Sequence, residues 1–294
     1  MELHIEELFS SQDPVQVERL YSLGRERILD WMKGRPRADL RIVEVEGDQE
    51  VVVVIPTADS KGRRSREASR IFHPLHVVLV ESSGNFFNYA SSVNAGIRRA
   101  MDLSPRWVVV SNDDVHKVDG VKTLVDELSV ATRGLVMASP SSYHSYRVSL
   151  VKMSPSFLRG MNVFGKVMRL PPAEVYSYLT LKYGAQLGVK TLVVIDSMLG
   201  PMKRVAGEVK DSFINAGSFM VLNRRILHER VLDETFINGY EDVLLSMKMR
   251  GDSEFIKFRI AEERGGSLGF GELRFLKSYV NEVYLNYLLW GSRT

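Results

Sequence analysis

The chain has 294 residues, of which 45% are hydrophobic and 26% are charged, an ordinary composition for a folded globular protein. Its 39 Lys and Arg residues against 36 Asp and Glu give a net charge of only +3, too small to predict a nucleic-acid partner. The absence of cysteine excludes disulfides and thiolate metal sites, and no segment has the apolar length of a signal-peptide core or a membrane span. We therefore expect a cytoplasmic protein with one large α/β domain and additions, or with two small domains.

The first segment with a regular pattern is residues 14–33, where many apolar side chains follow helical spacing after Asp13 and Pro14, a suitable N-terminal cap. We predict an amphipathic helix that packs outside the main sheet. Residues 42–45 and 51–55 follow, and both are rich in Val and Ile. They leave two interpretations open: a hairpin, or an edge strand followed by the first core strand.

Strands and helices are expected to alternate between residues 51 and 138. The predicted strands are 51–55, 76–80, 107–110 and 135–138, and the predicted helices are 65–72, 88–101 and 118–128. Continuous apolar runs without polar alternation are typical of strands that are covered on both faces. This order predicts an α/β fold with a mostly parallel, doubly wound sheet flanked by helices.

The alternation is lost over residues 141–210, which we interpret as an insertion over one face of the sheet. The remaining predicted features are a helix at 171–182, a strand at 192–195, an ordered segment at 213–222, a helix at 242–250 and a final helix within 273–294. The final helix is rich in Tyr and Trp. We interpret it as a core or oligomer face rather than a membrane anchor, and leave both oligomer formation and peripheral membrane association open.

Two adjacent acids, Asp113 and Asp114, directly follow the apolar run that begins at Trp107. In open α/β sheets, ligands bind just outside the carboxyl ends of the strands. Carboxylates at that position suit a hard divalent cation that is also held by substrate phosphates. Asn and Asp are also ordinary turn residues, and the Asn112-Asp113-Asp114 sequence on its own favours a simple turn.

Several short motifs occur along the chain in a particular order. They are Ile55-Pro56-Thr57, Val80-Glu81-Ser82-Ser83, Asn88 to Ile97, Asn112-Asp113-Asp114-Val115, Asn215 to Arg225, and Tyr240-Glu241-Asp242-Val243. In this order they resemble the motifs of family 2 glycosyltransferases with a GT-A fold, and most closely those of rhamnosyltransferase-like members. The resemblance covers about residues 51–140 and 212–269. Each motif alone is only a weak indicator of the family, so the resemblance rests on the order of the motifs along the chain.

The resemblance implies a domain organisation and an activity. Residues 1–49 would be an N-terminal helical extension, 50–272 a GT-A nucleotide-sugar domain with the 141–210 insertion on the acceptor side, and 273–294 a C-terminal helix. The implied activity is metal-assisted, inverting transfer of a sugar from a nucleotide-diphosphate sugar to a hydroxyl of a glycan, polysaccharide or lipid-linked acceptor. No nucleic acid is implied as a partner.

The resemblance also implies roles for individual residues. Asp242 would be the general base, supported by Glu241, and Asp114 would bind Mg²⁺ or Mn²⁺ with help from Asp113. The residues implied to contact the nucleotide sugar are Pro56, Thr57, Asp59, Glu81, Asn94, Asn112 and Asp113.

Two positions depart from the family pattern. The family often has a late histidine that completes the metal site, and this chain has Glu262 and Glu263 in that region. Either carboxylate could replace the histidine, because carboxylate oxygen suits Mg²⁺ and Mn²⁺. Glu81 is one methylene longer than the aspartate usual at the nucleotide-contacting position.

Simpler interpretations remain open at several positions. Glu241 and Asp242 would be favourable as helix N-terminal charges without any catalytic role. Asn94 and Gly96 would also serve helix–strand packing. We interpret Lys203 and Arg204 as part of a solvated loop rather than as a diphosphate clamp.

Two other functions also remain open for the whole chain. One is a degenerate GT-A protein that only binds or scaffolds. The other is a sugar-phosphate nucleotidyltransferase, which the glycine-poor loop 58–63 fits badly.

Overall fold

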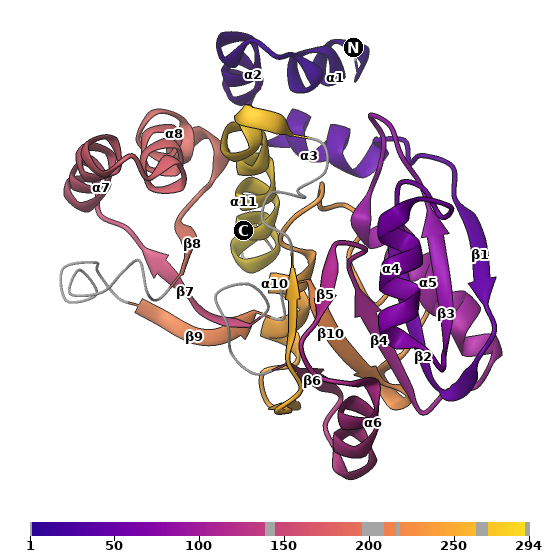
Figure 1. Ribbon diagram of the computed structural model, residues 1–294. Helices are drawn as coiled ribbons and strands as arrows, with labels where there is room; N and C mark the ends of the chain where they lie inside the picture. The colour runs from indigo at the N-terminus through magenta and orange to yellow at the C-terminus, as the bar shows by residue number, and fades with distance from the viewer. Residues whose placement is uncertain (1, 139–144, 196–208, 216–217, 263–269, 292–294) are drawn as a thin grey trace.

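The computed structural model describes residues 2–138, 145–195, 209–215, 218–262 and 270–291. Its main element is a seven-stranded, mostly parallel sheet flanked by helices (Figure 1). The strands in spatial order are β1 (Arg41–Val45), β3 (Leu75–Glu81), β2 (Asp48–Thr57), β4 (Trp107–Ser111), β10 (Phe219–Asn223), β6 (Leu135–Met137) and β11 (Ser253–Phe255). Only β1 and β10 run antiparallel to their neighbours, and the other five strands run in one direction. This confirms an α/β architecture with a mostly parallel central sheet.

The three strands expected at the centre of the sheet are neighbours. β2 pairs in parallel with β3 on one side and with β4 on the other, with Val53 opposite both Val77 and Val109. The predicted parallel arrangement of these strands is therefore confirmed. Since parallel strands end at the same edge, the residues that follow β2, β3 and β4 meet at one edge of the sheet.

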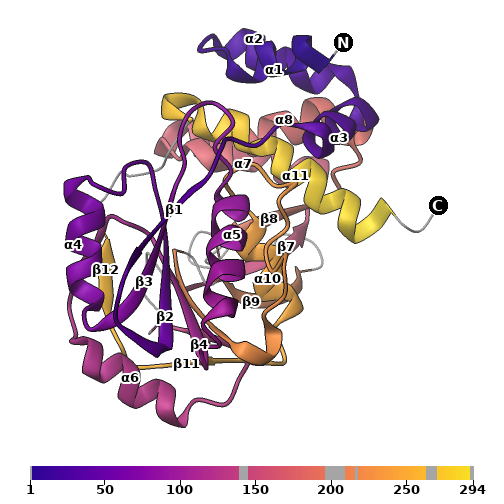
Figure 2. The same cartoon turned by 90° about the vertical axis from the view of Figure 1, so that its right-hand side faces the viewer.

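The valine runs form strands because both of their faces are covered. Val52 and Val54 pack on one face against α5 (Tyr89–Asp102), whereas Val51 and Val53 belong to the core under α4 (Arg63–Phe72) and α6 (Val121–Val130). Figure 2 shows α4 and α5 on opposite sides of these strands. A Cβ atom on Gly96 of α5 would lie 2.2 Å from Cγ1 of Val54. Glycine at this position therefore lets the helix approach the sheet.

The N-terminal region differs from the single helix predicted for residues 14–33. It contains α2 (Pro14–Arg19), a 3₁₀ turn η1 (Leu20–Leu23) and α3 (Arg25–Gly34), preceded by α1 (Glu2–Ser10). Asp13 caps α2 by accepting a hydrogen bond from the Val15 amide at 2.9 Å. The helix breaks at Gly24, whose φ of 88° is incompatible with helical continuation. β1 pairs with β3 and not with β2, so the edge-strand interpretation of residues 42–45 is confirmed over the hairpin.

Residues 145–195 and 209–215 form a separate group of elements rather than a simple cover on the main sheet. Its members are β7 (Tyr146–Lys152), α7 (Pro155–Met168), α8 (Pro171–Leu187), β8 (Thr191–Ile195) and β9 (Val209–Asn215). The three strands form an antiparallel sheet in the order β8-β7-β9. The helix beginning at Pro171 and the strand near residue 192 were predicted, but the second sheet was not. Lys203 and Arg204 lie outside the described residues.

The C-terminal helix α11 (Arg274–Trp290) contacts the N-terminal region, β8 and the residue before α10 (Figure 1). The hydroxyl of Tyr21, in the N-terminal region, donates to the main-chain oxygen of Leu276. Glu282 accepts hydrogen bonds from the Val193 amide of β8 at 3.0 Å and from the Tyr240 hydroxyl at 2.6 Å. Tyr279 and Val283 are fully buried, which confirms the core interpretation of this helix. Within the described ranges, none of the helices combines the length and the apolar character needed to cross a bilayer.

The remaining short elements position the candidate site. They are β5 (Val115–Lys117), η3 (Arg224–Ile226), α10 (Glu241–Lys248), β12 (Ile260–Glu262) and η4 (Gly271–Leu273). β5 and β12 form a two-stranded antiparallel sheet.

Candidate functional site

Polar side chains gather at the carboxyl edge of the central strands. Thr57 is the last residue of β2, Glu81 is the last of β3, and Asp113 and Asp114 follow β4. The Thr57 hydroxyl donates to Oδ2 of Asp113 at 2.6 Å, which links the ends of β2 and β4. Because β3, β2 and β4 are parallel neighbours, Glu81 and Asp114 lie at the same edge of the sheet. Pro56 is buried in β2, whereas Asp59 is exposed in the loop that follows.

Glu81 is held by groups from two sides of the edge. Its Oε2 accepts hydrogen bonds from Arg41 of β1 at 2.6 Å and from the Ser60 amide at 2.8 Å, and the Ser60 hydroxyl donates to the same oxygen. The Arg41 and Ser60 donors lower the pKa of Glu81 to about 2. The carboxylate is therefore ionised at neutral pH and positioned by protein groups. Its contact with a nucleoside stays a prediction.

Glu262 lies beside the acid pair that follows β4. In the β5–β12 ladder it is opposite Val115, the residue next to Asp114. Asn112 donates from Nδ2 to Oε1 of Glu262 at 3.3 Å. Burial, together with the negative charge of Asp114, raises the pKa of Glu262 to about 7. Of the two glutamates considered as replacements for the late histidine, Glu262 is thus close to Asp114, and Glu263 lies outside the described residues.

A second acid pair stands at the start of α10. Tyr240 precedes the helix in a left-handed conformation with φ 77°, and Glu241 and Asp242 occupy its first turn. Burial and the adjacent Asp242 raise the pKa of Glu241 to about 8. Oε2 of Glu241 is buried and has no hydrogen-bond partner among the described residues. Asp242 is half-buried, and its Oδ1 accepts from the Val243 amide at 2.7 Å.

Tyr89 lies within the Asn88 to Ile97 motif, was given no role there, and interacts electrostatically with both acid pairs. Burial and the charges of Glu241, Asp242, Glu262 and Asp114 all raise the pKa of its phenol. The hydroxyl is buried and has no hydrogen-bond partner among the described residues. The phenol therefore lies within electrostatic range of both acid pairs. No signal in the sequence pointed to this residue.

Asn94 does not join this group. It is fully buried in α5. Its side-chain amide donates to the Leu232 carbonyl oxygen at 2.8 Å and to Oε1 of Glu234 at 2.9 Å, and its oxygen accepts from the Leu232 amide at 3.0 Å. Asn94 therefore fastens the loop before α10 to α5, as the packing interpretation expected. Its contact with a nucleotide stays a prediction.

A cavity of about 300 Å³ adjoins the same edge of the sheet. It lies between the loop after β3, the end of α1 and the start of α11, and Ser82, Arg35 and Lys277 are among its lining residues. All three are buried. Arg35 pairs with Glu6 at 2.8 Å, and its Nη1 has no hydrogen-bond partner among the described residues. Burial lowers the pKa of Lys277. Two buried basic side chains, Arg35 and Lys277, thus line a cavity at the edge of the sheet that also carries Glu81.

The raised pKa of Glu262 predicts a specific pH dependence of stability. A carboxyl whose pKa is about 7 in the folded protein and near 4.5 when unfolded binds more protons in the folded state between these values. Stability should therefore fall as pH rises from about 4.5 to about 7. Glu262→Gln removes this contribution. We expect the variant to gain thermal stability relative to the parent at pH 8 and to gain less at pH 5, measured by calorimetric melting.

The matched control for this measurement is Glu229→Gln, which neutralises an exposed loop glutamate. Its melting temperature should differ from that of the parent by the same amount at both pH values. The electrostatic account of Glu262 is contradicted if Glu262→Gln also behaves in this way.

No family model matches the chain, and no curated protein matches it. Among solved structures, the substrate binding protein of the ABC transporter from Agrobacterium tumefaciens aligns over 84% of this chain and 99% of its own, with 9% sequence identity and a TM-score of 0.21. A likeness this low carries no argument about fold or function. Family membership therefore stays a prediction from the motifs.

Proposed function

We propose that the protein is an inverting glycosyltransferase with a GT-A fold, which moves a sugar from a nucleotide-diphosphate donor to an acceptor hydroxyl. The proposal is supported by the polar groups at the strand ends, where Thr57 donates to Asp113 and Asn112 donates to Glu262, and by the electrostatic effect of Asp114, Glu262, Glu241 and Asp242 on Tyr89. These acids come from motifs that are far apart in the chain. Carboxylates close to the carboxyl ends of parallel strands are compatible with transfer chemistry.

The donor set fits a bound Mg²⁺ or Mn²⁺. Two neighbouring carboxylates, Asp114 and Glu262, repel each other strongly enough to add to the raised pKa of Glu262, and a divalent cation would relieve this repulsion. The described residues contain no group of three His, Asp or Glu side chains arranged to hold a metal. Mg²⁺ is commonly held by one or two carboxylates together with substrate phosphates. Asp114, Asp113 and Glu262 would hold the ion, which would neutralise charge on the leaving diphosphate.

We assign different roles to the two acids of α10: one accepts a proton, and the other stays protonated. Glu241 is buried and has a pKa of about 8, so it keeps its proton at neutral pH. Asp242 is half-buried, and a hydrogen bond from its own helix fixes one oxygen. We assign Asp242 as the general base that accepts the proton of the acceptor hydroxyl. The protonated Glu241 carboxyl would donate a hydrogen bond within the site.

The donor would lie along the strand ends. The predicted nucleotide contacts are Pro56, Thr57, Asp59, Glu81, Asn112 and Asp113. The adjoining cavity adds Arg35 and Lys277, whose positive charges favour an anionic part of the donor. The acceptor would be a hydroxyl of a glycan, a polysaccharide or a lipid-linked molecule, approached from the side of residues 141–210.

Thermal denaturation with a panel of nucleotide sugars, with and without Mn²⁺, tests the proposal. A donor at 100 times its dissociation constant should stabilise the folded state by about 2.7 kcal/mol. We expect metal-dependent stabilisation by at least one donor and release of its nucleotide diphosphate when an acceptor is present. Stabilisation without release of nucleotide diphosphate in the presence of any acceptor would favour the non-catalytic binding protein. No stabilisation by any nucleotide sugar would contradict both the glycosyltransferase and the binding protein.

A further inference from the structure

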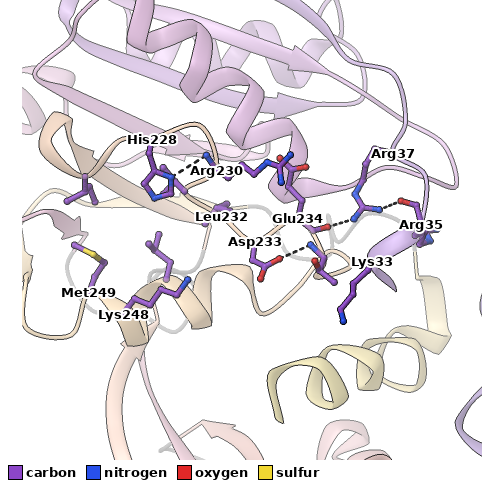
Figure 3. A pocket seen from close by; sticks show the side chains of 14 residues that line it. Lys33, Arg35, Arg37, His228, Arg230, Leu232, Asp233, Glu234, Lys248 and Met249 are labelled. Carbon is purple, nitrogen blue, oxygen red and sulfur yellow. Dashed lines mark hydrogen bonds between the residues drawn. The ribbon is translucent and has the colours of Figure 1, made fainter. Parts of the chain in front are cut away.

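A second cavity, of about 520 Å³, lies away from the acid cluster. It is lined by the segment that follows α3, by the loop between η3 and α10, and by the carboxyl-terminal end of α10 (Figure 3). Glu241 begins α10 in the candidate site, whereas Lys248 at the other end of the helix lines this cavity. The two sites are therefore separated by the length of α10.

Basic side chains dominate the lining of this cavity. They are Lys33, Arg35, Arg37, His228, Arg230 and Lys248, against only two acids, Asp233 and Glu234. In Figure 3, Lys33 and Arg37 lie on one side, His228 and Lys248 lie on the other, and the two acids lie between them. Lys33, His228, Arg230 and Lys248 are exposed to solvent. Cations that surround a cavity of this size favour an anionic small molecule.

Arg37 has a buried donor that no described residue accepts from. Its guanidinium donates to main-chain oxygens, those of Arg35, Pro36 and Glu234, the last at 2.5 Å. Nε of Arg37 is buried and has no hydrogen-bond partner among the described residues. Burial and the positive charge of Arg35 lower the pKa of Arg37, and the charges of Glu234 and Asp233 offset this only in part. An anion within reach of Arg37 would stabilise its charge further.

The two acids of the cavity are fixed by neutral donors rather than by its cations. Asp233 accepts from the Thr235 amide and from the Tyr284 hydroxyl, both at 2.9 Å. Glu234 accepts from Asn94 at 2.9 Å. A carboxylate has about four acceptor positions, so both side chains retain capacity for hydroxyl donors. A bare anion in the middle of the cavity would be repelled there, whereas a sugar hydroxyl would be bound.

We propose that this cavity is a binding site for a phosphorylated sugar, with phosphate on the flanking cations and hydroxyl groups on Asp233 and Glu234. The proposal does not rest on the glycosyltransferase assignment, because it uses none of its acids and shares only Arg35 with the proposed donor site. Pockets of a few hundred cubic ångströms are typical for ligands of this size.

Titration calorimetry of the full chain tests the site, with fructose 1,6-bisphosphate as the probe and EDTA present to exclude metal-dependent binding. The test variant is Arg230→Ala/Lys248→Ala, which removes two exposed cations of the cavity. Loss of even one charge-assisted hydrogen bond costs about 10- to 100-fold in affinity, and we expect at least that loss. The matched control is Arg66→Ala/Lys166→Ala, which removes two exposed cations elsewhere and should bind like the parent.

Three outcomes would overturn the proposal. The first is an absence of binding to the parent, and the second is an equal loss in the control variant, which would reveal a non-specific charge effect. The third is equal affinity for inorganic phosphate and for the sugar bisphosphate, because the two acids would then contribute nothing. Asp114→Ala should bind the probe like the parent, so a failure of this site and a failure of the proposed transferase site are distinguishable.

Discussion

Asp242→Asn is expected to lower the rate of sugar transfer by about 10²- to 10⁴-fold, the loss typical for removal of a general base. The amide oxygen of asparagine can still accept the hydrogen bond from the Val243 amide, so the start of α10 should be preserved. Donor affinity should stay nearly unchanged, because the base acts on the acceptor. Single-turnover rates at saturating donor, together with the donor dissociation constant, measure the two effects separately.

Glu241→Gln is the control for this experiment. Because the pKa of Glu241 is about 8, glutamine replaces a carboxyl that is already neutral at pH 7, and the loss of rate should be much smaller. Near-normal transfer by Asp242→Asn together with abolished transfer by Glu241→Gln would show that the base is the other acid of the pair.

The central sheet could be predicted because its signal is local. Val51 to Ile55 and Trp107 to Val110 are apolar without alternation, and only a strand covered on both faces buries such a run completely. Parallel strands end at one edge, so the approach of Thr57 to Asp113 followed from the same pattern.

Other features depend on contacts that the sequence does not carry. Gly24 lies inside a helical pattern, and its positive φ is set by how α2 and α3 pack. Asn94 belongs to a family motif, yet its hydrogen bonds go to residues 232 and 234, which only the folded chain brings near. Tyr89 and Glu262 were placed beside Asp114 by the fold and not by spacing. The order of motifs supplied the candidate acids, and the tertiary structure brings Asp114 and Glu262 near each other.

Asp114→Ala is expected to weaken metal-dependent binding of a nucleotide diphosphate by at least about 10- to 100-fold, a loss seen even for residues that only support a metal ligand. Asp114 is buried beside Glu262, and its removal leaves the proposed ion with too few carboxylates. The matched control is Asp126→Ala, which removes an exposed aspartate of α6 that pairs with Lys122 at 2.6 Å. It should bind like the parent.

Titration calorimetry of UDP, GDP and dTDP, with Mn²⁺ or with chelator, measures the central claim most directly. The titrations belong at pH 8, because a proton on Glu262, whose pKa is about 7, competes with the metal. For at least one nucleotide, the account predicts binding that requires Mn²⁺, that weakens at pH 6, and that Asp114→Ala loses. Equal binding by the parent and Asp114→Ala, with neither affected by chelator, would contradict it.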